Sequence, residues 1–204
     1  MSDDSDLEKP EKILKIIILG SSEVGKTCIL NRYFHNEFKE NLLSTIGIDF
    51  NTKFFKFDDH KIKANYIDTA GQEKFRAISI NYLKGTDGVI LVFDLTKKET
   101  FDLLESWIEQ LKQTNKTDTS KILIGNKSDL VNERQVTTED AQNFAESLKC
   151  KYYEASAKTG KNVTEALDEI AKIAFTNVSK NEDRINSIVL DGKEHNKNKE
   201  KKCC

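Results

Sequence analysis

The sequence predicts an α/β fold with a six-stranded, mostly parallel sheet, one antiparallel edge strand and helices on both faces. Three observations support this prediction. Short β-branched runs alternate with longer helical patterns, one polar turn joins two neighbouring strand runs, and a glycine-containing loop separates the first run from the first helix. Alternating strands and helices are typical of a parallel sheet covered on both faces, whereas a short turn makes a hairpin. A chain of 204 residues is long enough for one such domain.

Six runs are predicted as strands because they are short, rich in β-branched or aromatic residues, and bounded by glycine or polar residues. They cover residues 13–19, 48–57, 62–67, 88–93, 122–125 and 152–155. The polar residues 58–61 lie between the second and third runs and predict a hairpin turn. One of these two strands should therefore be the antiparallel edge strand.

Three helices are predicted between the strands. The first covers about residues 25–33. The second, at 99–113, has one apolar stripe with spacings of three and four residues, formed by Phe101, Leu104, Ile108 and Leu111. Trp107 lies on this helix, where packing is a simpler role than recognition. Thr137 or Thr138, followed by two acidic residues, is expected to begin the third helix.

The last helix and the two ends of the chain set the predicted domain boundaries. Asn162, with Glu165 three residues later, resembles a capping box. The apolar stripe behind it is formed by Val163, Leu167, Ile170 and Ala174. Polar and charged residues dominate both ends of the chain. We therefore expect a disordered acidic arm at 1–11, the domain at 12–177 and a flexible tail at 178–204.

The composition excludes several classes of protein. Lys and Arg number 32 against 34 Asp and Glu, for a net charge of −2, whereas a nucleic-acid-binding protein normally has a basic excess. No apolar run reaches the ~20 residues of a membrane span. The acidic N-terminus and four irregularly spaced cysteines predict a cytoplasmic chain without a disulfide framework. Two of them, Cys28 and Cys150, are expected to be small buried hydrophobic residues.

Residues 20–27 match the phosphate-binding pattern G-x-x-x-x-G-K-[ST], between a predicted strand and a predicted helix. In a P-loop NTPase, backbone N–H groups of this loop surround the phosphates and the helix N-terminus adds positive potential. Lys26 can reach the β- and γ-phosphates, and Thr27 can ligate Mg²⁺. A flexible surface loop is the alternative, and the strand–loop–helix context argues against it. The candidate nucleotide-binding residues are Gly20, Ser21, Ser22, Glu23, Val24, Gly25, Lys26, Thr27 and Cys28.

A second motif, Asn-Lys-Ser-Asp at residues 126–129, follows the strand predicted at 122–125. It should therefore lie at the carboxyl edge of the sheet, where α/β proteins bind ligands. The guanine N1–H and 2-amino groups are both donors, and the Asp129 carboxylate can accept from both. Adenine has an acceptor at N1, which would leave Asp129 unpaired at a cost of several kcal/mol. Asp129 therefore predicts guanine.

A third motif, residues 68–72, ends the strand predicted at 62–67. Asp68 is placed to hold a water molecule of Mg²⁺, Gly71 to donate its N–H to the γ-phosphate, and Gln72 to orient the attacking water. Each residue alone is more often structural than catalytic, so the prediction depends on the combination of the three motifs.

Five segments occur in the order GSSEVGKT, STIGIDF, DTAGQE, GNKSD and EASAK. Together they resemble the small GTPases of the Ras superfamily, particularly the Rab family, over about residues 12–176. The Rab-like features are residues 46–50, 72–76 and 92–96 and the terminal Cys-Cys pair. The resemblance implies a GTP-binding switch that hydrolyses GTP to GDP and recruits effectors to membranes in vesicle traffic. It also implies GTP or GDP and Mg²⁺ as ligands, and a monomer.

The same resemblance assigns further residues by their motif positions. Thr45 would ligate Mg²⁺ by its hydroxyl and the γ-phosphate by its N–H, and Phe38 would stack near the edge of the base. Lys127 and Lys158 would sandwich the guanine, and the Ala157 N–H would meet its carbonyl oxygen. Outside the phosphate loop the implied nucleotide site is Phe38, Thr45, Gly71, Asn126, Lys127, Asp129, Ser156, Ala157 and Lys158. The implied catalytic residues are Gln72 and Lys26, and the implied metal ligands are Thr27, Thr45 and Asp68.

Two positions depart from the family pattern. Glu23 stands where the family usually has Gly or Ala, so its charge either speeds GDP release or weakens GTP binding, or else points outward with little effect. Ile67 stands where Rab proteins usually have Trp. The resemblance implies an apolar effector patch formed by Ile46, Phe50, Ile67 and Tyr82, and losing the aromatic ring would change which effectors it binds.

The end of the chain predicts a lipid anchor. Residues 193–204 contain five Lys against two Glu and end in Cys203 and Cys204. This terminus resembles the Rab double cysteine, on which both thiols are geranylgeranylated. Two lipid chains beside several lysines suffice for stable anchoring to an anionic leaflet. An unmodified tail with two reactive thiols is the alternative.

By this resemblance the partners are effectors, an exchange factor, a GTPase-activating protein, a prenylation escort protein and a dissociation inhibitor. The chain would be cytoplasmic and reversibly bound to a membrane. One alternative is a Rab-like nucleotide-binding module that cycles fast or hydrolyses poorly because of Glu23. Another is a P-loop kinase or ATPase, against which Asp129 argues.

Overall fold

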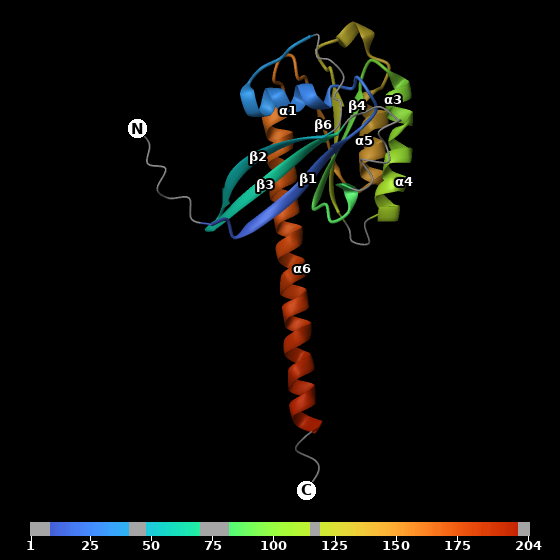
Figure 1. Ribbon diagram of the computed structural model, residues 1–204. Helices are drawn as coiled ribbons and strands as arrows, with labels where there is room; N and C mark the ends of the chain where they lie inside the picture. Colours follow the sequence, from blue (N-terminus) through green and yellow to red (C-terminus); the bar gives the residue numbers. More distant parts are fainter. Residues whose placement is uncertain (1–8, 41–47, 70–81, 115–118, 200–204) are drawn as a thin grey trace, which may run out of the picture.

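The computed structural model describes residues 9–40, 48–69, 82–114 and 119–199, with side chains up to residue 182. Its centre is a six-stranded sheet in the order β2-β3-β1-β4-β5-β6 (Figure 1). The strands are β1 (Lys12–Leu19), β2 (Ile48–Phe57), β3 (His60–Thr69), β4 (Gly88–Asp94), β5 (Ser120–Asn126) and β6 (Lys151–Glu154). β2 is antiparallel to β3, and all other neighbouring strands are parallel. The predicted fold class is therefore confirmed.

The sheet is buried on both faces because alternate side chains enter two apolar clusters. Along β1, Ile16 and Ile18 belong to one cluster, and Ile17 and Leu19 belong to the other. All seven residues of β4 are buried. Side chains alternate across a strand, so a run that is apolar at every position places apolar groups on both faces. This burial explains why the inner strands are continuous β-branched runs in the sequence.

Helices from distant parts of the chain cover the two faces (Figure 1). They are α1 (Lys26–His35), α3 (Lys98–Asp102), α4 (Leu104–Thr114), α5 (Thr138–Ser147) and α6 (Val163–Lys199), with a short 3₁₀ turn at Val131–Glu133. α1 and α6 contribute to the cluster on one face, and α4 and α5 to the cluster on the other. Trp107 of α4 is buried in the second cluster, as predicted.

The predicted helix 99–113 is instead two helices, α3 and α4, that meet at Leu103. The Leu103 N–H donates to the Glu99 oxygen, whereas the Leu103 oxygen accepts from both the N–H and the hydroxyl of Ser106. Serine side chains that bond to a nearby backbone carbonyl compete with the regular helical pattern. The apolar stripe predicted the buried face but not this local change.

The two predicted helix starts have different outcomes. Thr137 precedes α5, and its hydroxyl accepts from the Asp140 N–H at 3.0 Å, so that prediction is confirmed. The capping box at Asn162 is wrong, because the Asn162 amide donates to the Glu154 oxygen at 2.7 Å. Asn162 also has a φ of 55°, outside the extended region of a capping residue. Its side chain ties the start of α6 to the end of β6.

α6 is longer than the helix that the apolar stripe predicts. A flexible tail was expected from residue 178, but α6 continues through Lys199 and extends beyond the domain in Figure 1. Residues 178–199 contain no proline, the residue that most strongly ends a helix, and their one glycine is Gly192. Near the domain, Lys12 donates to Ser179 at 3.0 Å and pairs with Glu182 at 2.6 Å. Within the described part of the chain, no helix combines the length and apolarity needed to cross a membrane.

Candidate functional site

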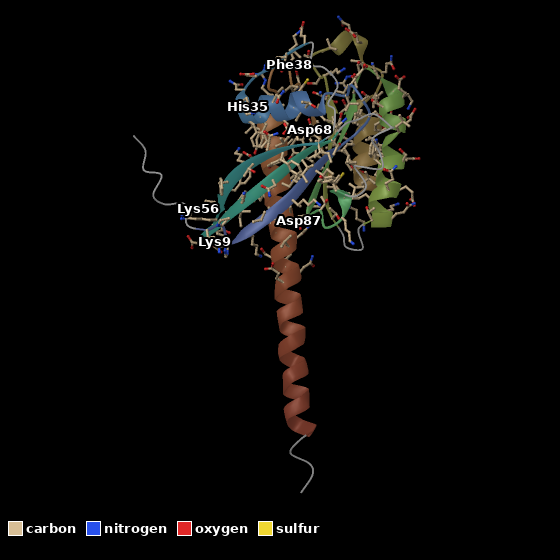
Figure 2. All side chains as sticks on the ribbon, in the orientation of Figure 1. Lys9, His35, Phe38, Lys56, Asp68 and Asp87 are labelled. Carbon is tan, nitrogen blue, oxygen red and sulfur yellow. The ribbon has the colours of Figure 1, made fainter. Side chains whose placement is uncertain are left out.

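The candidate site lies at one edge of the sheet, where β1, β3, β5 and β6 end. Strands that run parallel bring their carboxyl ends to the same edge, so motifs far apart in the sequence meet there. Figure 2 shows Phe38 and Asp68 toward this edge, whereas Lys9 and Lys56 lie at the other end of the ribbon formed by β2 and β3. The hairpin between β2 and β3 therefore points away from the site.

The phosphate loop needs glycine at both ends for close packing. A Cβ on Gly20 would lie 2.1 Å from the Val92 oxygen of β4, and one on Gly25 would lie 2.3 Å from the Asn126 side chain. Gly25 also has a φ of 94°, a left-handed conformation that favours glycine. Close packing against two neighbouring strands therefore shapes the loop that leads into α1.

Lys26 is a buried cation inside the loop. Its ammonium donates to the Gly20 oxygen at 2.9 Å and to the Ser21 oxygen at 2.8 Å. Burial lowers the pKa of Lys26 to about 8, and the nearby Asp68 carboxylate opposes part of this change. Lys26 is therefore mostly charged at neutral pH, as a phosphate-binding lysine must be.

Asp68 and Thr27 join the end of β3 to α1 through their side chains. The Thr27 hydroxyl donates to Asp68 Oδ2 at 2.6 Å. Asp68 is only 1% exposed, and its Oδ1 has no hydrogen-bond partner among the described residues. Burial raises the pKa of Asp68, whereas the Thr27 hydrogen bond and the Lys26 charge lower it. A buried carboxylate oxygen beside a hydroxyl is a donor set that suits a hard cation.

Asn126 connects three segments of the site. Its amide donates to the Val24 oxygen in the phosphate loop at 2.8 Å. Its Oδ1 accepts from the Ala157 N–H at 3.2 Å. The Ala157 N–H, which the resemblance assigned to the guanine carbonyl, is therefore also within reach of Asn126. This buried side chain holds the phosphate loop and the loop after β6 at fixed positions.

Asp129 is held by the loop after β6. The buried Ser156 hydroxyl donates to Asp129 Oδ1 at 2.6 Å and accepts from the Thr159 N–H at 3.1 Å. The Ser128 N–H donates to the Ala155 oxygen at 3.0 Å, which joins the two loops through their backbones. The two motifs predicted to contact the base are therefore in direct contact.

Both lysines assigned to the base have their ammonium groups in ion pairs. Lys127 lies 2.6 Å from Asp94, and Lys158 lies 3.0 Å from Glu40. Asp94 is fully buried and also accepts from Thr96. The sequence prediction missed Asp94, although a carboxylate that ends an entirely apolar strand at the ligand edge could have indicated it.

Arg32 is the second residue that the sequence prediction missed. Its guanidinium extends from α1 to the loop after β6 and donates to the Ala157 and Lys158 oxygens, each at 2.9 Å. In the sequence Arg32 is one polar position in a predicted helix, and nothing in that pattern indicates its partners.

The remaining residues of the phosphate motif differ in burial. Val24 is buried, and Cys28 is half-buried, as is Cys150, rather than fully buried as expected. Burial raises the pKa of the Cys28 thiol. Phe38 is partly buried against the cluster that includes α1. Glu23 is 70% exposed and lies 3.2 Å from Lys97, so its carboxylate contacts the loop after β4.

The predicted effector patch is only partly described. Phe50 is exposed, and its ring centroid lies 6.0 Å from that of Tyr82. Ile67 is 3% exposed and packs in the second cluster, so it is wrong as a surface residue of this patch. The isoleucine side chain, which is smaller than the Trp usual in Rab proteins, remains within the core. The other predicted site residues outside the described part of the chain are Thr45, Ile46, Gly71, Gln72, Cys203 and Cys204.

Comparisons with known proteins agree with this geometry. The family model described as "Ras family" matches residues 15–176. Ras-related protein Rab-11C of Dictyostelium discoideum is 42% identical over 80% of this chain and 73% of its own length. Ras-related protein RABA5c of Arabidopsis thaliana is 37% identical over 100% of this chain and 99% of its own. GTP-binding protein ypt2 of Schizosaccharomyces pombe is 41% identical over 78% of this chain and 80% of its own length. The chain therefore belongs to the Ras family of GTP hydrolases, as a Rab-type small GTPase that binds guanine nucleotides.

Proposed function

We propose that this chain is a Mg²⁺-dependent GTP switch that hydrolyses GTP to GDP and, in its GTP form, recruits effectors to a membrane during vesicle traffic. The observation that supports it most is the meeting of Lys26, Asp68 and Asp129 at one sheet edge. A charged lysine suits phosphates, a buried carboxylate suits a cation, and a held carboxylate suits the guanine donors.

The phosphate end of the site supports binding of the triphosphate. The loop from Gly20 to Thr27 leads into the N-terminus of α1, which supplies N–H donors and positive potential. Lys26 adds a full charge that its burial keeps from being screened by water. In this proposal Lys26 stabilises the negative charge that develops on the phosphates during transfer.

The residues around Asp68 fit Mg²⁺. Among the described residues, no three His, Cys, Asp or Glu side chains gather as a self-sufficient metal site. Mg²⁺ in phosphate-transfer sites is held by a few protein oxygens together with substrate phosphates, and the oxygens of Thr27 and Asp68 fit such a site. Thr45 is the third proposed ligand. When bound, Mg²⁺ would neutralise charge on the β- and γ-phosphates.

The hydrolysis step requires residues outside the described part of the chain. Gln72 is proposed to orient the attacking water, and the N–H groups of Thr45 and Gly71 are proposed to bind the γ-phosphate. Loss of that phosphate would release both N–H contacts, so the segments around 36–48 and 69–83 would change together. Ser22 and Glu23 provide no arginine within the phosphate loop. Unaided turnover should therefore take on the order of tens of minutes until an activating protein completes the site.

Membrane attachment is proposed through prenylation of Cys203 and Cys204. The preceding lysines would add attraction to an anionic leaflet. An escort protein for prenylation, a dissociation inhibitor, an exchange factor and effectors are the partners that this cycle requires. Phe50 and Tyr82, whose rings lie near one another, are the described part of the proposed effector patch.

The experiment that tests the nucleotide proposal changes the base that the site accepts. Wild-type chain should bind GTP in preference to ATP, and Asp129→Asn should shift binding toward xanthosine triphosphate. Xanthine has a carbonyl where guanine has its 2-amino group, and an asparagine amide can donate to it. Asp102→Asn, an exposed residue of α3, is the matched control and should keep the guanine preference. Equal competition by ATP, or an unchanged preference in Asp129→Asn, would contradict the proposal.

A further inference from the structure

Arg32 of α1 holds two segments that border the proposed base site. Nε and Nη2 donate to the Ala157 and Lys158 oxygens at 2.9 Å each. Nη1 donates to the Asn36 backbone oxygen at 2.8 Å and to Asn36 Oδ1 at 2.9 Å. The planar guanidinium therefore joins the C-terminal end of α1 to the loop after β6, with two hydrogen bonds to each.

The peptide unit between Lys158 and Thr159 extends this contact further. A trans peptide is planar, and its C=O and N–H groups point in opposite directions. The Lys158 oxygen accepts from Arg32, and the Thr159 N–H on the other side donates to Ser156 Oγ at 3.1 Å. Holding the oxygen toward Arg32 therefore directs this N–H toward Ser156.

Ser156 links the 158–159 peptide to the Asp129 carboxylate through its hydroxyl group. A serine hydroxyl has one proton, and the Thr159 N–H already occupies an acceptor position on its oxygen. The proton is donated to Asp129 Oδ1 at 2.6 Å. Ser156 is buried, so water does not compete for these bonds, and successive hydrogen bonds in such surroundings polarise one another.

We propose that Arg32 is a positioning residue for base recognition, which acts through the 158–159 peptide and Ser156 to orient the Asp129 carboxylate. This inference rests on the proposed role of Asp129 as the acceptor of the guanine N1–H and 2-amino groups. One carboxylate accepts both donors only if its plane matches the edge of the base. Arg32 should therefore affect recognition of the 2-amino group more than binding of the phosphates.

The test compares GDP with IDP, because inosine lacks only the 2-amino group of guanosine. Dissociation constants of both nucleotides would be measured on the full chain by displacement of a fluorescent GDP. In Arg32→Ala the ratio of the IDP to the GDP constant should fall about three- to tenfold, the effect of one net hydrogen bond. Arg32→Lys keeps the charge but cannot hold both carbonyls with one planar group, so an intermediate ratio is expected.

Two further substitutions, alone or combined with Arg32→Ala, separate a positioning role from a general loosening of the structure. Ser156→Ala should lower the same ratio, and combining it with Arg32→Ala should add little, because both changes interrupt one chain of bonds. Lys53→Met is the matched control. Lys53 donates to Tyr33 at 2.9 Å and to Asp168 at 3.0 Å, so it joins β2, α1 and α6 without touching the loop after β6. Its loss should leave the ratio unchanged.

The outcomes distinguish this inference from the function on which it rests. If both Arg32 variants bind GDP and IDP more weakly by the same factor, Arg32 is a structural residue and the inference is overturned. If Arg32→Ala does not fold, the other two variants decide. An unchanged ratio of the IDP to the GDP dissociation constant in Arg32→Lys and Ser156→Ala would also overturn the inference. If the wild-type chain binds GDP and IDP equally well, the proposed guanine site itself is overturned.

Discussion

Glu23 combines an acidic side chain with a left-handed backbone inside the phosphate loop. Its φ is 64°, a region that favours glycine and that costs other residues about 1 kcal/mol or more. Its carboxylate is exposed and pairs with Lys97, an interaction of small value at the surface. The Glu23 charge was expected either to disturb nucleotide binding or to point outward with little effect, and the geometry favours the second.

Replacing Glu23 by glycine should therefore stabilise the protein. We expect Glu23→Gly to raise the free energy of unfolding in urea by about 0.5–1 kcal/mol, because the strain is relieved. Glu23→Ala is the matched control, since it removes the charge but keeps the strained backbone, and it should not stabilise. GDP release should stay within about twofold of wild type in both variants, because exposed charges are well screened. Much slower release in both would instead show that the Glu23 charge repels the nucleotide.

Glu154 shows how one side chain fixes several elements. It lies at the end of β6 and accepts from both terminal nitrogens of Arg134, at 2.9 and 2.7 Å, and from Thr138 at the start of α5 at 2.7 Å. Tyr152 donates to it as well. Burial raises the pKa of Glu154, but the bonds from Arg134 and Thr138 together hold that pKa below its usual 4.5.

Glu154→Gln should destabilise the protein by about 1–2 kcal/mol at pH 7, since the variant loses the charge that strengthens the Arg134 bonds. A carboxyl group with a lowered pKa in the folded state stabilises it above 4.5, and this stabilisation is lost as pH falls through the folded pKa. The difference in unfolding free energy between wild type and variant should therefore narrow as pH falls below 4.5 in urea unfolding curves. Glu146 is an exposed residue of α5, and the control variant Glu146→Gln should leave the free energy of unfolding unchanged. If the difference in unfolding free energy between wild type and Glu154→Gln stays constant with pH, the Glu154 charge does not contribute to stability.

At the level of elements, the sequence predicted what local patterns determine and missed what distant contacts determine. The Thr137 cap needs only the next three residues, and it was predicted correctly. The Asn162 amide bonds to Glu154 on the preceding strand instead of capping α6, so a local motif was misleading. The partners of Arg32 in the loop after β6 lie 125 and 126 residues away, and no spacing rule connects them to Arg32.

At the level of the whole molecule, the topology joins the base site to the far end of the chain through α6. The loop that holds Asp129 through Ser156 ends where α6 begins. Figure 1 shows α6 passing along the sheet and leaving at the end opposite α1. Parallel strands explain why the nucleotide motifs could be grouped from the sequence: each follows a strand, and all such ends share one edge. The sequence could not predict the course of α6 past residue 178, because a polar helix has no apolar stripe.

α6 ends at Lys199, and the proposed lipid anchor follows it in the sequence, so changing the terminal cysteines should separate membrane binding from catalysis. We expect Cys203→Ser with Cys204→Ser to move a tagged full chain from the membrane fraction to the soluble fraction, because both lipid chains are lost and lysines alone bind membranes weakly. Cys204→Ser alone should give partial and reversible attachment, since one chain is marginal. GDP affinity should equal that of wild type in every variant. Cys150→Ser, which changes a half-buried thiol beside the second cluster, is the control and should stay on the membrane. Unchanged membrane association of the double serine variant would show that something other than these two thiols binds the chain to the membrane.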